Sequence, residues 1–226
     1  MRKTIQVALD GPGGAGKSTL ARAAAAAGGL HYVDTGAMYR SVALGVVRAG
    51  VNVRDREAVV AVLPGLKVTL DYDVEGKQHT LLNGEDVSGL IRTPEVTAAA
   101  SAVSALPEVR AFLLRAQQNM AEEWDVVMDG RDIGTVVLPD AELKIFMTAK
   151  PEVRARRRFL QLREKGIEAD YDEVLKDVTQ RDYNDSHRAA APLRQAEDAI
   201  YIDNSELTLA EDIENMKGIV WEAKCR

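Results

Sequence analysis

The sequence has little of several residue types that often define a class of protein. Its 226 residues include one cysteine, Cys225, and three histidines. A single cysteine permits no disulfide framework within the chain, and no Cys/His cluster suggests a zinc site. This usage is expected in a reducing compartment, so we predict a cytoplasmic protein.

Long apolar runs are missing as well. No segment approaches the roughly 20 apolar residues of a membrane span, so we expect no membrane association. The formal net charge of −6 argues against a partner that is a nucleic acid. A hydrophobic content of 46% with 28% charged residues is typical of a globular protein, and the length suits one α/β domain with small insertions.

What the sequence does have is a glycine-rich segment near its start, DGPGGAGKST, from Asp10 to Thr19. The apolar run before it (residues 4–9) is typical of a buried strand, and the alanine-rich run after it (residues 19–29) is typical of a helix. G-x-x-x-x-G-K-[ST] in this strand–loop–helix context predicts a phosphate-binding loop. The alternative is a glycine-rich turn that binds nothing.

The chemistry of such a loop follows from its residue types. Glycines let successive backbone N–H groups point at an anion, and the helix N-terminus adds partial positive charge. We expect Lys17 to reach the outer phosphates of a nucleotide. Ser18 is expected to meet a phosphate-bound magnesium ion, directly or indirectly.

Strand-like and helix-like runs alternate along most of the chain, which indicates a parallel α/β sheet. Two strand-like runs, 67–73 and 78–84, are instead joined by a short turn and predict an antiparallel hairpin in an inserted subdomain. Residues 93–124 are expected to be helical with a break near Pro107. A turn is expected at residues 34–36, with Thr35 as a possible cap of the next helix.

Arginines gather in the helix expected from Pro151 to Gly166. Helical spacing puts Arg154, Arg157 and Arg158 on one face and Arg156 on the other. Three like charges that no local acid neutralises repel one another unless an anion relieves them. A phosphate would do so; the alternative is an ordinary solvated face.

Charges of both signs follow the apolar strand expected to end near Asp129. Arg131 and Asp132 lie directly after it, where ligands bind in open α/β sheets. A salt-bridged turn is the alternative interpretation. Residues 180–193 alternate arginine and aspartate, and a surface helix with internal ion pairs would look the same.

Together these segments resemble the bacterial cytidylate kinases, which are nucleoside-monophosphate kinases. The matching stretches, in the family's order, are DGPGGAGKST, DTGAMYR, DGRDIGTVV, VRARRR and RDYNDSHRAAAPL. The resemblance implies a P-loop NTPase core, with a parallel sheet flanked by helices, a small antiparallel β insert and a short lid. It divides the single domain into a core (1–62, 125–150 and 189–226), a monophosphate-binding insert (about 63–124) and a lid (about 151–188).

The resemblance also implies transfer of the γ-phosphoryl group of ATP to CMP or dCMP by a monomer, with Mg²⁺ bound alongside ATP at Ser18. The ATP-binding residues would be Gly11, Pro12, Gly13, Gly14, Ala15, Gly16, Lys17, Ser18 and Thr19. Thr35, Arg40, Arg131 and Arg188 would hold the CMP phosphate, Ser101, Arg110 and Asp132 the cytosine, and Asp185 the ribose. Lys17, Arg131, Arg157, Arg158 and Arg181 would be the catalytic residues.

Two other classes of function remain open from the sequence. One is a P-loop kinase for another small acceptor, such as shikimate or a different monophosphate. The other is a nucleotide-dependent switch, although the chain lacks N-K-x-D, the usual guanine-reading motif. A histidine base is not required for the kinase, because a phosphate acceptor is already mostly ionised near pH 7.

Overall fold

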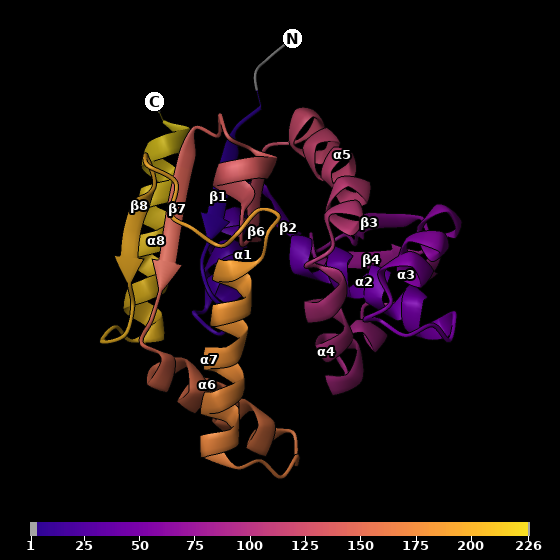
Figure 1. The fold of residues 1–226 in the computed structure, drawn as a ribbon. Helices are drawn as coiled ribbons and strands as arrows, with labels where there is room; N and C mark the ends of the chain where they lie inside the picture. The colour runs from indigo at the N-terminus through magenta and orange to yellow at the C-terminus, as the bar shows by residue number, and fades with distance from the viewer. Residues whose placement is uncertain (1–3, 226) are drawn as a thin grey trace.

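The computed structural model describes residues 4–225, so the outermost residues of the predicted core lie outside it. A central sheet has the strand order β2–β6–β1–β7–β8, and every neighbouring pair is parallel (Figure 1). The strands are β1 (Gln6–Asp10), β2 (His31–Asp34), β6 (Val126–Gly130), β7 (Leu143–Thr148) and β8 (Ile200–Asp203). Parallel pairing brings their carboxyl ends to one edge, the lower edge in Figure 1. The predicted α/β class is confirmed.

Helices cover both faces of this sheet, which explains the nearly continuous apolar runs of its inner strands. On one face, α1 (Lys17–Gly28) lies along α8 (Leu209–Lys224), and the alanines of α1 pack with Met216 and Val220. On the other face lie α5 (Pro107–Glu123) and a short π-helical turn, η3 (Ile133–Val137). The strand ends are therefore held firmly from two sides.

A second, antiparallel sheet lies beside the central one, with the order β3–β4–β5. Its strands are β3 (Val68–Tyr72), β4 (Gln78–Leu82) and β5 (Glu85–Asp86), so the predicted hairpin is confirmed. The expected break near Pro107 is confirmed too, because α4 (Pro94–Val103) ends before it and α5 begins there. Proline suits the first turn of a helix because the N–H that it lacks has no helical partner there.

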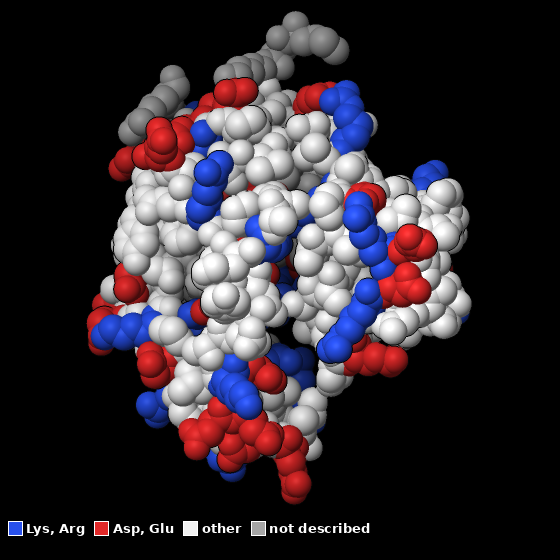
Figure 2. Space-filling model, viewed as in Figure 1, with Lys and Arg blue, Asp and Glu red and all other residues white. Residues whose placement is uncertain are grey.

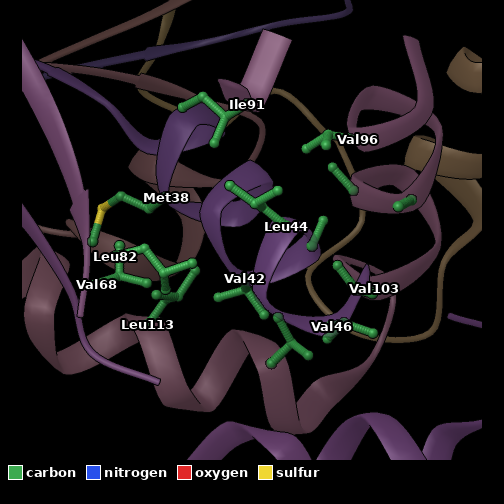
Figure 3. Packing of buried hydrophobic residues seen from close by; sticks show 14 of the residues in the cluster. Met38, Val42, Leu44, Val46, Val68, Leu82, Ile91, Val96, Val103 and Leu113 are labelled. Atoms are coloured by element: carbon green, nitrogen blue, oxygen red, sulfur yellow. The ribbon is translucent and has the colours of Figure 1, made fainter. Parts of the chain in front are cut away.

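Helix α2 (Thr35–Arg48) follows β2 of the central sheet and packs against the second sheet and α4 (Figure 3). Met38, Val42 and Val46, spaced by four residues, are buried in one apolar cluster with Val68 of β3 and Val103 of α4. The cluster also contains residues of α3 (Arg56–Val62), η1 (Leu63–Gly65) and η2 (Leu90–Arg92). Because it extends across residues 62 and 63, the boundary between core and insert stays a prediction.

The turn expected at residues 34–36 is wrong, because β2 ends at Asp34 and α2 begins at Thr35. Asp34, not Thr35, caps the helix: its carboxylate accepts a hydrogen bond of 2.8 Å from the Ala37 N–H. A carboxylate at this position satisfies an N–H without a helical partner and also suits the helix dipole. The buried Thr35 hydroxyl donates instead to the Asp129 carbonyl, at 2.8 Å.

Two further helices project from the carboxyl edge of the sheet as an adjacent pair (Figure 1). They are α6 (Pro151–Glu164) and α7 (Tyr171–His187). Within the described residues, no single helix is both long and apolar enough to cross a bilayer; α4 and α5 pass such a test only as a pair, bent by 99°.

Candidate active site

A cleft with a volume of about 790 Å³ lies at the carboxyl edge of the central sheet. Its walls come from the glycine-rich loop, the start of α2, the α4–α5 region and the α6–α7 pair. Figure 2 shows a hollow between the α6–α7 pair and the α2–α4 lobe, with Lys and Arg side chains at its rim. The cleft thus joins the loop to most of the other charged segments that the sequence singled out.

The glycine-rich loop lies tightly against the sheet. Gly11 has a φ of 146°, and a Cβ there would stand 1.8 Å from the Met147 carbonyl oxygen of β7. Gly16, with a φ of 93°, precedes α1, and no side chain caps this helix start within the described part of the chain. The first N–H groups of α1 therefore remain for an anion.

Three loop carbonyls are held by side chains. Lys17 Nζ donates to the Pro12 oxygen at 2.8 Å, and an Arg154 nitrogen donates to the Gly13 oxygen at 3.0 Å. The Asn204 amide donates to the Ala15 oxygen at 2.9 Å. These bonds fix one side of the loop, which stabilises its curl around the space above α1.

Lys17 and two aspartates form a buried group beneath the loop. Burial, and secondly the Arg131 charge, lower the pKa of Lys17 to about 7. Burial, and then the neighbouring Asp34, raise the pKa of Asp129 to about 6. The Asp10 carboxylate accepts hydrogen bonds of 2.8 and 2.7 Å from the backbone of Ile133 and Gly134, so it supports the start of η3.

The fit to magnesium rests on Ser18 and Asp129. The Ser18 hydroxyl donates to the Asp129 carboxylate at 2.6 Å, beside the loop. Across residues 4–225, no group of three or more His, Cys, Asp or Glu side chains forms a metal cage. Mg²⁺ is usually held by one or two oxygen ligands, waters and substrate phosphates, so this small oxygen set fits an ion that arrives with a nucleotide.

A network of arginines and aspartates lines the opposite part of the cleft. Asp132 contacts both Arg110 of α5 and Arg188 at the end of α7. Asp185 of α7 accepts from Arg131 at 2.8 Å and lies 4.0 Å from Arg188. The alternative interpretation of the residues after Asp129, a salt-bridged turn, predicted such ion pairs. They are present, and they line the same cleft as the phosphate-binding loop.

Two arginines in the cleft have unused hydrogen-bonding capacity. The Nε atoms of Arg40 and Arg181 are buried without a hydrogen-bond partner among the described residues. Burial, with the nearby Arg131 charge as the second cause, lowers the pKa of Arg181 to about 10. Such crowding of like charge is unfavourable without an anion, so these side chains are suited to hold one.

Three residues that the sequence did not single out as site residues complete the arginine-rich half of the cleft: Asp34, Tyr39 and Arg92. Asp34 accepts from Arg40 at 3.0 Å and from Arg92 at 3.1 Å, so one carboxylate orients two arginines. The Arg110 guanidinium lies 5.2 Å from the ring centre of Tyr39. Asp34, Tyr39 and Arg40 all belong to the DTGAMYR stretch, which was the available signal for the first two.

Ser101 lies beside the cleft and is not among its lining residues. It lies on α4, where Thr97 and Ala100 line the cleft, as does Ser104 directly after the helix. The structure places Arg110 and Asp132 together, and within residues 4–225 no hydrogen bond joins Ser101 to either of them. Its contact with cytosine stays a prediction.

The expectation that no acid neutralises the arginine face of α6 is wrong for Arg154. This buried side chain forms an ion pair with Asp182 of α7, with one N–O distance of 3.0 Å. Arg157 instead donates to Asn204, and Arg158 donates to Gln161 at 2.8 Å. Arg157 and Arg158 line the cleft, whereas Arg154 ties α6 to α7 and to the loop.

A parallel sheet with a phosphate-binding loop, facing an arginine-rich pocket across one cleft, defines a P-loop kinase. Residues 7–221 match the cytidylate kinase family. The cytidylate kinase of Caldicellulosiruptor saccharolyticus is 50% identical over 214 residues, which cover 95% of this chain and 94% of the relative. The cytidylate kinase of Mycolicibacterium paratuberculosis is 48% identical over 221 residues, with coverage of 97% and 96%. The chain therefore belongs to the cytidylate kinase family, as its sequence motifs predicted.

Solved structures offer a more distant likeness. The shikimate kinase from Bacteroides thetaiotaomicron covers 98% of this chain, and 99% of that chain is matched, at 16% identity and a TM-score of 0.49.

Proposed function

We propose that the protein transfers the γ-phosphoryl group of ATP to CMP or dCMP, giving ADP and the nucleoside diphosphate. The observation that carries this proposal is the single cleft in which the phosphate-binding loop faces the Arg110–Asp132–Arg188–Asp185–Arg131 network. Phosphoryl transfer needs two polyanions side by side and in line, and positive charge between them. The cleft supplies both binding halves.

The donor half would hold the triphosphate of ATP. Residues Gly11 to Thr19 would surround the phosphates with backbone N–H groups, and Lys17 would contact the outer ones. Ser18 and Asp129 would hold Mg²⁺, directly or through water, and the ion would neutralise charge on the β- and γ-phosphates. This proposal is supported by the uncapped start of α1 and by the short Ser18–Asp129 bond.

The acceptor half would grip the phosphate of CMP with Thr35, Arg40, Arg131 and Arg188. The unused hydrogen-bonding capacity of Arg40 supports this role. Arg131 lies between the two halves. Its Nη2 atom is 3.4 Å from the point where a Cβ on Gly13 of the loop would stand. It is suited, with Arg181, to contact the group in transit. No protein base is needed, because the acceptor oxygen already carries negative charge.

Cytosine recognition would rest on Asp132 and Arg110, with Ser101 as a further predicted contact. Cytosine has an exocyclic amino group, which donates, where uracil has a carbonyl oxygen, which accepts. The Asp132 carboxylate accepts hydrogen bonds from the amino group and repels the uracil oxygen. Arg110 offers donors to the acceptor side of the ring, and Asp185 would accept from the ribose.

The α6–α7 pair would act as a lid that excludes water, since water in the cleft would hydrolyse ATP. Arg157 and Arg158 would then contact the phosphoryl group in transit. We also propose, from the composition and the family, a cytoplasmic monomer. No nucleic acid or membrane partner is part of this proposal.

The test is a coupled ADP-release assay with ATP, magnesium and one acceptor at a time. The proposal predicts rapid turnover with CMP and dCMP, slower turnover with UMP, and none with shikimate. Turnover with shikimate alone would establish the rival kinase. Nucleotide binding without transfer to any monophosphate would favour a switch.

A further inference from the structure

Asn204 lies directly after β8 and is almost fully buried, with 1% of its surface exposed. Its side-chain amide donates to the Ala15 carbonyl of the glycine-rich loop at 2.9 Å and to the Asp212 carboxylate of α8 at 2.7 Å. Its side-chain oxygen accepts from Arg157 of α6 at 3.2 Å, and its backbone oxygen accepts from the same guanidinium at 3.1 Å. One residue thus meets three other parts of the molecule.

The orientation of this amide is fixed by its surroundings. An amide nitrogen has two hydrogens, and the two acceptors, Ala15 and Asp212, take both. The amide oxygen must therefore face Arg157. If the amide were rotated by 180°, its oxygen would face two acceptors, the Ala15 carbonyl and the Asp212 carboxylate. Asp212 therefore keeps the amide oxygen directed at Arg157.

Asn204 is also anchored to the central sheet. Its N–H donates to the Thr148 carbonyl at the end of β7, at 3.0 Å. Arg157, by contrast, lies on α6, which projects from the sheet. Because a guanidinium binds two acceptors in a fixed plane, two bonds to one anchored residue restrict both the position and the rotation of Arg157.

We propose that Asn204 is a positioning residue, which fixes Arg157 beside the phosphate-binding loop and so couples the position of the lid to that of the loop. The inference rests on the proposed function, in which Arg157 acts on the transferring phosphoryl group. Asn204 is among the residues that line the cleft, but its contact with the loop is made through the Ala15 carbonyl, and it is not assigned a contact with substrate. Asp212 serves it by holding the amide in the correct orientation.

A double-mutant cycle on turnover tests the coupling. Arg157→Ala should lower kcat about 100-fold, a typical result for loss of one charged contact in the transition state. Asn204→Ala should lower kcat about 10- to 100-fold through misplacement of Arg157, and KM for CMP should stay within about twofold. The double variant should be no slower than Arg157→Ala alone, since both changes remove the same contribution.

A charge-conserving exchange provides a second test that does not depend on a truncated side chain. Asn204→Asp alone places an acceptor against the Ala15 carbonyl and the Asp212 carboxylate, so kcat and nucleotide affinity should both fall. Combining it with Asp212→Asn returns one donor to the pair and should recover kcat at least fivefold over Asn204→Asp. This exchange remains informative even where Asn204→Ala does not fold.

Hydrogen exchange of α6 provides a readout other than turnover. Asn204→Ala should increase exchange in α6 of the nucleotide-free protein. The matched control is Asn52→Ala: this exposed side chain accepts from the Arg54 N–H in its own loop, and its loss should not change exchange in α6. Effects of Asn204→Ala and Arg157→Ala that multiply, or a loss of thermal stability with kcat unchanged, would overturn the proposal. Failure of the unmodified protein to phosphorylate CMP would instead contradict the proposed function, and the exchange measurement would still test the contact.

Discussion

The two halves of the cleft are built in different ways. The donor half comes from one continuous stretch, residues 11–19, together with the Ser18–Asp129 bond. The acceptor half is assembled from side chains of α2, α5, α7 and the end of β6, and three of its ion pairs join residues 22, 54 and 56 positions apart. A phosphate site made of backbone is local in the sequence, whereas a site that reads a base needs side chains from several elements.

The difference has an energetic consequence. Backbone N–H groups and a helix N-terminus need no charged partner when the site is empty. The acceptor-side arginines are largely buried and need aspartates to compensate them, because an unpaired buried charge is strongly destabilising. Asp34, Asp132 and Asp185 therefore have two roles: they stabilise the empty cleft, and they orient the arginines for a phosphate.

The largest effect is expected from a substitution in the donor half. Lys17→Ala should lower kcat about 100- to 1,000-fold, because a positioned charge near the transferring group is lost. The fold should persist, since Lys17 contributes one hydrogen bond to a loop carbonyl. Turnover and circular dichroism would be measured on the same preparation. A folded variant with normal kcat would remove Lys17 from the mechanism.

The next prediction concerns the selectivity of the acceptor half for cytosine over uracil. Asp132→Asn should lower kcat/KM for CMP about 10- to 100-fold, the value of one hydrogen bond to a charged group. UMP should lose less, because an amide can donate to the uracil oxygen. Steady-state assays with both acceptors give the ratio directly. If the CMP-to-UMP ratio were unchanged, Asp132 would be only a partner of Arg110 and Arg188.

Stability against pH gives the smallest expected effect. The pKa of Asp129 is raised to about 6 from 3.8, so the folded protein retains a proton that the unfolded chain releases, and its contribution to stability falls as the pH rises through this window. Asp129→Asn removes that penalty. Relative to the original chain, the variant should become more stable by about 3 kcal/mol between pH 4 and pH 8.

Urea denaturation of both proteins at pH 4 and pH 8 measures this difference. The mutation should at the same time weaken the magnesium dependence of nucleotide binding, because the oxygen ligand loses its charge. An equal stability difference at the two pH values would show that the Asp129 carboxylate is not penalised by burial.

The same contrast explains what could be predicted from the sequence. The sheet, the hairpin, the helix break at Pro107 and the family were predictable because each depends on local patterns or on contiguous motifs. The prediction that no acid neutralises Arg154 was wrong, because its partner Asp182 lies on the next helix, 28 residues away in the sequence. Asn204 carried no signal at all: a lone asparagine after a strand is ordinary until the fold brings Ala15, Arg157 and Asp212 to it.

The central claim is that one cleft contains two separable binding halves. Calorimetric titration with MgADP and, separately, with CMP tests it most directly on Lys17→Ala and Arg188→Ala. Arg188→Ala leaves Asp132 paired with Arg110 and Asp185 paired with Arg131, so the network keeps its remaining compensation. The account predicts that Lys17→Ala weakens MgADP binding about tenfold or more and leaves CMP affinity unchanged, while Arg188→Ala does the reverse. Loss of both affinities in either folded variant would contradict it.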